Sequence, residues 1–309
     1  MTSFDQSPFG ELLHTFRKRK RLTQQRLADS IGMHRHAISR WELGDVLPAS
    51  KAIVLELARC LHLNDQEARN LLEASLAAPA PLWGVPFPRN LFFTGRQETL
   101  AVLRSHLRVD RDDVLPQVAA LHGLGGIGKT QIALEYAYRH ALDYRAIFWV
   151  EAETPEHVWS SLLRMADLLQ LPERTEMKQQ RVVEAIQRWL TTHDQWLLIW
   201  DNLEDLELPQ RLLPPGLRGT YLFTTRRQAL GTLAQGITLP PMDLEEGMLL
   251  LLRRAKVLEQ QAASEQVTQL RERMPAEYRA ASQLVTMLGG LPLALDQAGA
   301  YLEETGCSL

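Results

Sequence analysis

PQVAALHGLGGIGKTQIALEY, residues 116–136, is the stretch that decides the fold of this chain. It opens with a short apolar run, continues through a glycine-rich segment that ends in Lys129 and Thr130, and passes into small and apolar residues at helical spacing. This order predicts a strand, a glycine loop and a helix. The rest of the chain is organised around that unit.

The glycine segment fits the P-loop pattern G-x-x-x-x-G-K-[ST], with Gly123 first and Gly128, Lys129 and Thr130 last. Glycines let backbone N–H groups curve around an anion, and the start of the next helix adds unpaired N–H groups and a positive dipole end. Lys129 is expected to neutralise β- and γ-phosphates, and the Thr130 hydroxyl to ligate Mg²⁺. A merely flexible turn is disfavoured because strand, loop and helix follow in the required order.

The composition is that of an ordinary soluble protein. The 309 residues suffice for two or three domains, and 45% hydrophobic with 23% charged residues excludes a largely disordered chain. Cys60 and Cys307 form no Cys-x-x-Cys pair, so neither a disulfide framework nor a zinc site is predicted. No apolar run approaches the roughly 20 residues that span a bilayer, and no signal peptide is recognisable. We therefore expect a cytoplasmic protein with no membrane partner.

Charge is distributed unevenly along the chain. Residues 1–44 contain eight Lys or Arg and four Asp or Glu, a net charge of +4, so a total of −3 leaves −7 for the remainder. This asymmetry predicts an N-terminal segment that meets a polyanion and a larger acidic body that does not.

Residues 1–76 have the pattern of five short helices. Thr23 is a suitable N-cap for the second helix, and Gly32 ends it. Ser50 is placed to cap the fourth helix, and Asn64, followed three residues later by an acid, resembles the capping box of a fifth. Two helices joined by a short glycine-containing turn inside a basic domain form a helix-turn-helix.

LTQQRLADSIGMHRHAISRWELGDVLP, residues 22–48, resembles the lambda-repressor-like (XRE-type) helix-turn-helix, and the resemblance covers nearly all of residues 8–76. It implies binding of double-stranded DNA. The third helix, expected at about 34–41, would read bases from its N-terminal end. The DNA-contacting residues so assigned are Arg19, Lys20, Gln24, Arg35, His36, Ser39 and Arg40.

These residues have different expected roles. Arg19, Lys20 and Gln24 would meet phosphates, which position the protein without specifying sequence. His34 departs from the resemblance, because the family usually has a Ser or Thr cap at that place. A metal site around His34 and His36 is disfavoured, since no Cys or carboxylate accompanies them at ligand spacing. A helical interaction domain with a solvated basic face remains an alternative.

A proline-rich linker is predicted at 77–92, between the helical domain and the body. Four prolines in ten residues cannot continue a helix or occupy a central strand. Trp83 and Phe87 are large for a free linker, so part of it is expected to lie against the following domain.

The body alternates apolar runs with helical segments, which predicts an α/β P-loop NTPase fold with a parallel sheet covered on both faces. Thr154 with Pro155 marks the start of one of the helices. We expect a nucleotide-binding domain at 93–243 and a helical subdomain at 244–309. The expected strands after the glycine loop are residues 146–150, 196–200, 220–225 and 237–239.

Two charged residues follow strands at the edge where such sheets bind ligands. Asp201 comes directly after the apolar run 196–200 and is expected to hold Mg²⁺ opposite Thr130, with a simple helix cap as the alternative. Arg226 is expected to reach the γ-phosphate and distinguish ATP from ADP. The alternatives are that Arg227 has this role, or that both arginines are solvated surface residues.

The residue after Asp201 bears on catalysis. Asn202 cannot accept a proton at neutral pH, whereas a second carboxylate there would serve as a general base. Glu204 and Asp205 are nearby substitutes, but spacing alone does not place them. We therefore expect hydrolysis to be slow if it occurs.

Six motifs in this order resemble the NB-ARC domains of STAND-class signalling ATPases. They are FTGRQE (93–98), GLGGIGKT (123–130), FWVEAE (148–153), LLIWDN (197–202), LFTTRR (222–227) and GGLPLAL (289–295). The resemblance implies that ATP or ADP binds with Mg²⁺. The nucleotide-binding residues are then Phe93, Gly95, Arg96, Gly123, Gly125, Gly126, Ile127, Gly128, Lys129, Thr130, Gln131 and Pro292, with Lys129, Asp201 and Arg226 acting on the phosphates and magnesium.

The resemblance also implies a function. It predicts a nucleotide-controlled signalling switch and transcription regulator that self-associates in its ATP state. In this family a winged-helix domain and trigger-binding repeats follow, and neither occurs in the sequence, so we expect a fragment or a short member with an unknown trigger ligand. A steadily turning-over ATPase and a defence or signalling scaffold with a protein-binding head are the alternatives.

Overall fold

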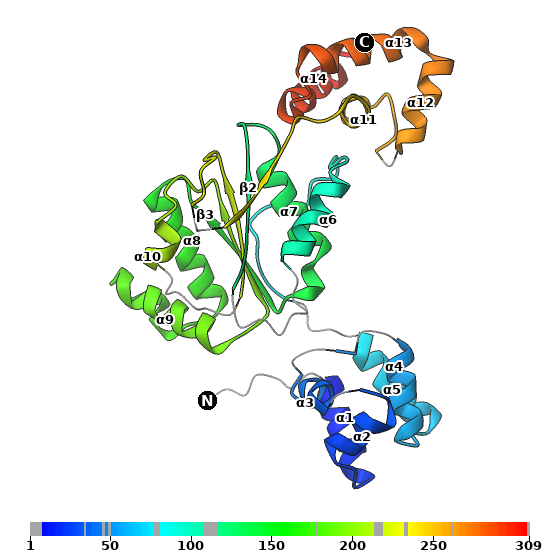
Figure 1. Ribbon diagram of the computed structural model, residues 1–309, viewed down its shortest axis with the longest axis vertical. Coiled ribbons are helices and arrows are strands. Elements are labelled where there is room, and N and C mark those ends of the chain that lie inside the picture. The colour runs from blue at the N-terminus through cyan, green and yellow to red at the C-terminus, as the bar shows by residue number, and fades with distance from the viewer. Residues whose placement is uncertain are drawn as a thin grey trace. The chain divides into compact units, whose positions relative to one another are not determined.

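The computed structural model of the protein describes residues 8–33, 35–44, 47–48, 51–76, 81–107, 116–176, 178–212, 219–231, 234–260 and 262–307. The chain divides into two compact units, Met1–Ala80 and Pro81–Leu309 (Figure 1). The boundaries expected at 92/93 and 243/244 lie inside the second unit and stay predictions.

The first unit is helical. Its helices are α1 (Pro8–Arg19), α2 (Gln24–Ser30), α3 (Arg35–Glu42), α4 (Lys51–Cys60) and α5 (Asp65–Leu76). Phe9, Leu13, Leu27, Ile38 and Leu57 are fully buried and join the helices in one core. Helix α3 ends at Glu42, one residue beyond the expected end at about 41.

Two predicted helix starts are confirmed by their hydrogen bonds. Thr23 caps α2 by accepting the N–H of Arg26 on its Oγ1 at 3.1 Å. Asn64 and Glu67 form a reciprocal capping box, because each side chain accepts the backbone N–H of the other, at 2.8 and 3.1 Å. The predicted cap Ser50 and the departure at His34 lie outside the described residues.

A buried ion pair joins α1 to α3 within this unit. Glu42 accepts the Nη2 of Arg17 at 2.7 Å and the Nε2 of Gln24 at 2.9 Å. Burial alone would raise the pKa of Glu42, but the hydrogen bonds from Arg17, Gln24 and His14 outweigh it, so this pKa lies below its usual value. The carboxylate is therefore compensated inside the unit.

The second unit is built on a six-stranded sheet in the order β1-β3-β4-β5-β2-β6, and the paired strands are parallel. The strands are β1 (Leu82–Gly84), β2 (Gln117–His122), β3 (Ala146–Glu151), β4 (Trp196–Asp201), β5 (Thr220–Thr225) and β6 (Gln235–Thr238). The α/β fold is confirmed. The last strand lies slightly earlier than the expected 237–239.

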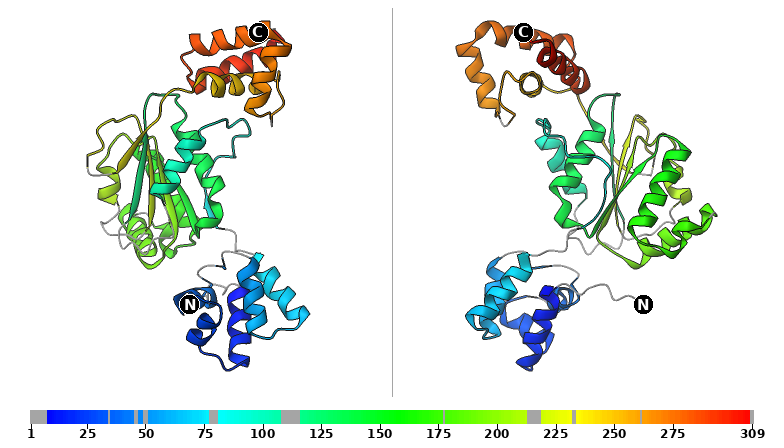
Figure 2. Two further views of the ribbon diagram at one scale, coloured as in Figure 1. Left: turned by 45° about the vertical axis from the view of Figure 1, so that its right-hand side comes forward. Right: turned by 180° about the vertical axis from the view of Figure 1, so that it is seen from behind.

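Helices cover both faces of the sheet (Figures 1 and 2). Helices α6 (Gln97–His106) and α7 (Lys129–Arg139) cover one face, while α8 (Pro155–Leu168) and α9 (Gln179–Thr192) cover the other. Thr154 caps α8 as predicted, with Pro155 in the first turn. The short helices η1 (Ala141–Asp143), η2 (Pro172–Thr175) and α10 (Leu208–Leu212) lie in the connections.

Side chains alternate between the two faces along each strand. In β3, Phe148 and Val150 join the core beneath α8 and α9, while Ile147 and Trp149 join the core beneath α7. Every residue of β4 is buried, which explains its continuous apolar run.

The final helices form a cluster with a core of its own. They are α11 (Leu244–Arg254), α12 (Ser264–Arg273), α13 (Pro275–Met287) and α14 (Pro292–Thr305). Met248, Leu251, Val285 and Leu295 are buried among them. No helix in the described part of the chain is long and apolar enough to cross a membrane.

The proline-rich stretch contributes a strand that sequence reasoning did not anticipate. Residues Leu82–Gly84 form β1, which pairs with β3 at the edge of the sheet. Prolines are tolerated next to an edge strand because the outer side of that strand makes no hydrogen bonds to another strand. As expected, the aromatic residues lie against the body. The rings of Trp83 and Tyr138 are 4.7 Å apart, and those of Phe87 and Trp149 are 5.6 Å apart.

Candidate functional site

The glycine loop connects β2 to α7 at the carboxyl edge of the sheet. Gly128 is the N-cap of α7 and has φ +99°, a conformation that side-chain-bearing residues rarely adopt. No side chain caps this helix, so its first N–H groups are available to an anion. The loop has the geometry that the P-loop pattern predicts.

Lys129 lies over this loop. Its Nζ donates to the backbone oxygens of Gly123 at 3.0 Å and Leu124 at 2.8 Å. Burial and, next, the neighbouring charge of Arg226 lower the pKa of Lys129, while Asp201 raises it. The ammonium is therefore held inside the site, where a phosphate would be a better partner than two carbonyls.

Thr130 and Asp201 meet as predicted. The Oδ1 of Asp201 accepts the Thr130 hydroxyl at 2.8 Å and the Thr224 hydroxyl at 2.6 Å. Burial raises the pKa of Asp201, although the hydrogen bonds from the two threonines oppose the shift. Asp201 is thus a buried carboxylate that receives hydroxyls rather than a guanidinium or ammonium.

This donor set suits magnesium. Mg²⁺ prefers oxygen ligands and is commonly held by one or two carboxylates together with substrate phosphates. Thr130 and Asp201 supply a hydroxyl and a carboxylate within one hydrogen-bond length of each other. These two residues would hold the ion, which would neutralise phosphate charge when bound.

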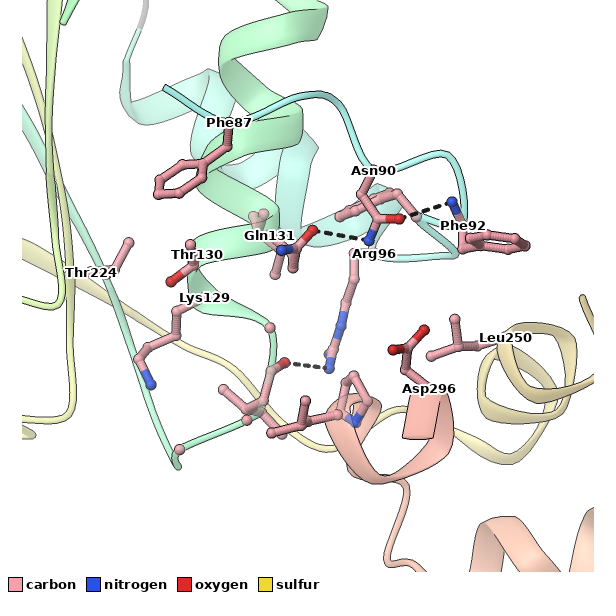
Figure 3. Close-up of a pocket in the computed structure, with 18 of the residues that line it drawn as sticks. Phe87, Asn90, Phe92, Arg96, Lys129, Thr130, Gln131, Thr224, Leu250 and Asp296 are labelled. Atoms are coloured by element: carbon pink, nitrogen blue, oxygen red, sulfur yellow. Dashed lines mark hydrogen bonds between the residues drawn. The ribbon is translucent and has the colours of Figure 1, made fainter. Parts of the chain in front are cut away.

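A cavity of ≈ 970 Å³ extends from the glycine loop toward the helical cluster (Figure 3). Most of the predicted nucleotide residues line it, namely Phe93, Arg96, Gly125, Gly126, Ile127, Gly128, Lys129, Thr130, Gln131, Asp201, Arg226 and Pro292. Gly95 and Gly123 lie outside this wall.

Gly95 lies against Glu246 and has a backbone conformation that favours glycine. It has φ +67°, and a Cβ on it would lie 2.3 Å from the Oε1 of Glu246. The same oxygen accepts the backbone N–H of Arg96 at 2.9 Å. The segment before α6 is thereby attached to the start of α11, a contact between residues 150 positions apart.

The expected base-binding segment is held from three sides. Asn90 accepts the N–H of Phe92 at 2.9 Å and donates to Gln131 at 2.9 Å (Figure 3). The Nη2 of Arg96 donates to the backbone oxygen of Ile127 at 3.5 Å. Asn90 was not predicted, because a lone Asn in a loop carries no motif.

The helical cluster supplies the remaining wall. The N–H of Leu293 donates to the oxygen of Gly126 at 3.2 Å, which joins α14 to the glycine loop. The guanidinium of Arg254 lies 5.3 Å from the centre of the Phe92 ring, within cation–π range. Arg254 and Thr224 also line the cavity, and sequence reasoning missed both. The pattern that identified Asp201, an apolar run followed directly by an acid, identifies neither Arg254 nor Thr224.

Arg226 lines the cavity with a side chain that is 61% exposed. Its Nε lies 3.8 Å from Glu204, and the Nε of Arg227 lies 3.9 Å from the same carboxylate. Asp205 instead pairs with Arg211 and accepts the N–H of Glu207 at 3.0 Å. Neither Glu204 nor Asp205, the two suggested substitute bases, is among the residues that line the cavity.

In the helical unit, α3 presents the predicted base-reading residues on one side. Arg35 and His36 are exposed and Ser39 and Arg40 are half-buried, whereas Ile38 and Trp41 are buried. The expected reading surface and the core are therefore on different faces of α3.

The predicted phosphate contacts are less uniform. Lys20 is exposed. Gln24 donates its amide to Glu42, and Arg19 makes two bonds to Glu67, at 2.5 and 3.0 Å. The hydrogen bonds from Arg19 and, next, from the backbone N–H of Asn64 lower the pKa of Glu67 to about 2. A phosphate would have to compete with that carboxylate for Arg19.

Comparison with known families gives two matches. Residues 8–72 match a helix-turn-helix domain, and residues 97–260 match the NB-ARC domain. The second match covers more than half of the chain.

Two curated proteins and a solved structure are similar to part of this chain. A nucleotide-binding leucine-rich repeat (NLR)-like protein of Hyaloscypha variabilis is 29% identical over 72% of this chain and 23% of its own length. Regulatory protein AfsR of Streptomyces griseus is 29% identical over 68% of this chain and 21% of its own. This chain thus spans less than a quarter of either relative.

The solved structure is a STAND protein with a tetratricopeptide repeat sensor from Pyrococcus horikoshii. It is 18% identical, with a TM-score of 0.42, over 67% of this chain and 30% of that one.

Proposed function

This chain belongs to the NB-ARC family, and on that premise we propose that it is an ATP/ADP-controlled signalling switch that regulates transcription through its helix-turn-helix domain. The family match makes it a nucleotide-binding signalling module with a helix-turn-helix domain. The identity of the nucleotide, the magnesium ion and the bound DNA belong to the proposal.

The observation that carries the proposal is the 2.8 Å contact between the Thr130 hydroxyl and Asp201 beside the loop that Lys129 crosses. A hydroxyl, a carboxylate and an ammonium thus lie together at the start of α7, where no side chain caps the helix. Lys129 would bind the β- and γ-phosphates, and Thr130 with Asp201 would hold Mg²⁺. Phe93, Arg96, Gln131 and Pro292 would bind the base and ribose.

Arg226 would make the site respond to the γ-phosphate. Its exposed guanidinium lies at the end of β5 and can turn from Glu204 to a new anion. A nucleotide shifts an equilibrium between two forms only if it binds them unequally, and a ~10-fold preference supplies about 1.4 kcal/mol. Nucleotide, trigger ligand and self-association would then act together.

The nucleotide carried by the purified protein tests this proposal. We expect wild type to retain ADP or ATP and Lys129→Ala to retain neither, with affinity about 100-fold lower, since a desolvated phosphate loses its charged partner. Lys178→Ala, at an exposed position before α9, should bind as wild type does. Equal retention by Lys129→Ala would refute the assignment.

The DNA-binding half of the proposal has its own experiment. Affinity for duplex DNA should fall steeply with salt, and Arg35→Ala should weaken it. Arg69→Ala, exposed on α5, is the matched control. The name of the regulatory relative supports this role. A helical head that binds protein in a defence scaffold is the alternative that an absent salt slope would favour.

A further inference from the structure

The position after Asp201 explains why a catalytic base must be sought elsewhere. Asn202 has φ +59°, a left-handed conformation that Asn adopts more readily than most residues. Its backbone N–H donates to the Thr224 hydroxyl at 2.9 Å, which fixes this turn. The amide side chain cannot take a proton from water.

Glu151 is the carboxylate that the sheet places beside Asp201. It ends β3, and its partner in the parallel register with β4 is Asp201. Ile147 and Trp149 of β3 share one core with Leu197 and Ile199 of β4. Because strand side chains alternate, both acids fall on the face that those residues occupy.

That face is the one covered by α7, which begins with Lys129 and Thr130. Residues of α7 such as Ile132 and Ala133 belong to the same core as Ile147 and Trp149. Glu151 also lines the cavity together with Lys129, Thr130 and Asp201. The Glu151 side chain therefore borders the cavity that Lys129, Thr130 and Asp201 line, while Arg164 of α8 reaches it from the end of the strand.

A single tether orients this carboxylate. The Oε1 of Glu151 accepts the Nη2 of Arg164 at 2.6 Å, and that guanidinium nitrogen also donates to the Ser161 hydroxyl at 2.9 Å. Ser161 in turn accepts the backbone N–H of Glu151 at 3.1 Å. In the described part of the chain Oε2 has no hydrogen-bond donor, so one oxygen is anchored and the other is open to water.

We propose that Glu151 is the general base that activates water for ATP hydrolysis, in the role that Asn202 cannot fill. The inference rests on the proposed nucleotide site. The water oxygen forms a bond to the γ-phosphorus while the bond from that phosphorus to the β–γ bridging oxygen breaks. The bridging electron pair leaves with ADP. The water proton passes to Oε2 of Glu151 and then to solvent.

The arrangement also assigns a positioning role to Arg164. It holds Oε1 and is not among the residues that line the cavity, so it sets the direction in which Oε2 points. A positioned base of this kind contributes typically 10²–10⁴-fold to a rate. The chain therefore has the parts for a single slow hydrolysis step even though Asn202 follows Asp201.

The test is Glu151→Gln, which keeps the size of the side chain and an oxygen for Arg164. Single-turnover hydrolysis of pre-bound ATP should slow by about 100-fold or more. Equilibrium binding of ATP and ADP should stay within about threefold of wild type, because no phosphate contact is removed. Protein loaded with ATP and then isolated should still hold ATP where wild type holds ADP.

Two further variants keep the test decisive. Glu156→Gln, an exposed acid in the first turn of α8, should hydrolyse ATP as wild type does. Glu151→Asp retains a carboxylate one carbon shorter, and its rate should fall between those of wild type and Glu151→Gln. It also serves if Glu151→Gln does not fold.

The outcomes separate the two proposals. Wild type that binds no nucleotide overturns the proposed function and this role together. Wild type that binds ATP without hydrolysing it overturns this role alone, as does full activity in Glu151→Gln. Loss of hydrolysis in Glu204→Gln but not in Glu151→Gln would move the base to Glu204.

Discussion

Two buried carboxylates, Glu42 in the helical unit and Asp201 in the body, have pKa values shifted in opposite directions. Glu42 in the helical unit receives the guanidinium of Arg17 and has a lowered pKa. Asp201 in the body receives hydroxyls from Thr130 and Thr224 and has a raised pKa, because burial outweighs those bonds. The first charge is balanced by the protein itself.

The difference separates a structural ion pair from a binding site. A buried charge that lacks a cation costs stability, and such groups are retained where a ligand supplies the counter-charge. Asp201 opens onto the cavity that Lys129 and Thr130 line, whereas Glu42 is enclosed between α1 and α3. The contrast predicts that loss of the Glu42 ion pair destabilises the helical unit, whereas loss of the Asp201 carboxylate weakens ligand binding.

The largest effect should come from Arg17→Met, which leaves Glu42 buried without its cation. We expect the free energy of unfolding of the helical unit to fall by about 3–5 kcal/mol. Urea unfolding followed by circular dichroism measures it. Arg19→Met removes an exposed arginine that is also paired with a glutamate, so it should change stability little. Equal effects of the two variants would contradict the comparison.

Asp201→Asn should give the opposite result. Without nucleotide, the free energy of unfolding of the body should be unchanged or about 1 kcal/mol higher, because a desolvated charge is gone. Magnesium-dependent ATP binding should weaken by about 10- to 100-fold, since one ligand of the ion is lost. Titration calorimetry with and without Mg²⁺ checks this, and a large loss of stability would refute it.

Acid should reveal the Glu42 pair through the variant Glu42→Gln. A lowered pKa means that the pair stabilises the folded unit above the ordinary Glu value of about 4.3, and that this contribution is lost as pH falls through the folded value. The stability difference between wild type and Glu42→Gln should be constant from pH 7 to about 5. Below about pH 4 it should shrink by at most about 1.4 kcal/mol per pH unit, the limit for one proton. A difference that persists in acid would argue against an ionised Glu42.

The smallest effect should be that of Glu67→Gln on DNA binding. The amide keeps an oxygen for the Asn64 cap but no longer neutralises Arg19. Freed to contact a phosphate, Arg19 should steepen the slope of log affinity against log salt by up to about 0.9. Fluorescence anisotropy at several salt concentrations measures the slope. An unchanged slope would remove Arg19 from the DNA interface.

Local sequence signals predicted much of this structure. The caps at Thr23, Asn64 and Thr154 were predictable because each depends on residues within one helical turn. The meeting of Thr130 with Asp201 was also predictable, since each follows a parallel strand and such strands end at the same edge.

Other contacts carried no local signal. The contact of Gly95 with Glu246 joins residues far apart in the sequence, and the ion pair of Glu42 with Arg17 joins two helices. The edge strand Leu82–Gly84 lies in a stretch whose prolines indicate a linker, because its partner β3 is far along the chain. Three residues are too few to show the alternation and composition by which strands are recognised.

The sequence by itself determined the parallel sheet, the glycine loop with Lys129 and Thr130, and the helix-turn-helix, because periodicity, caps and glycine spacing act over a few residues. The tertiary structure alone decided which charges are compensated and which stay open to a ligand. It put the guanidinium of Arg17 on Glu42, hydroxyls in place of a cation on Asp201, and Glu151 beside Asp201 through strand register. Burial and partners depend on distant residues, and no spacing along the chain records them.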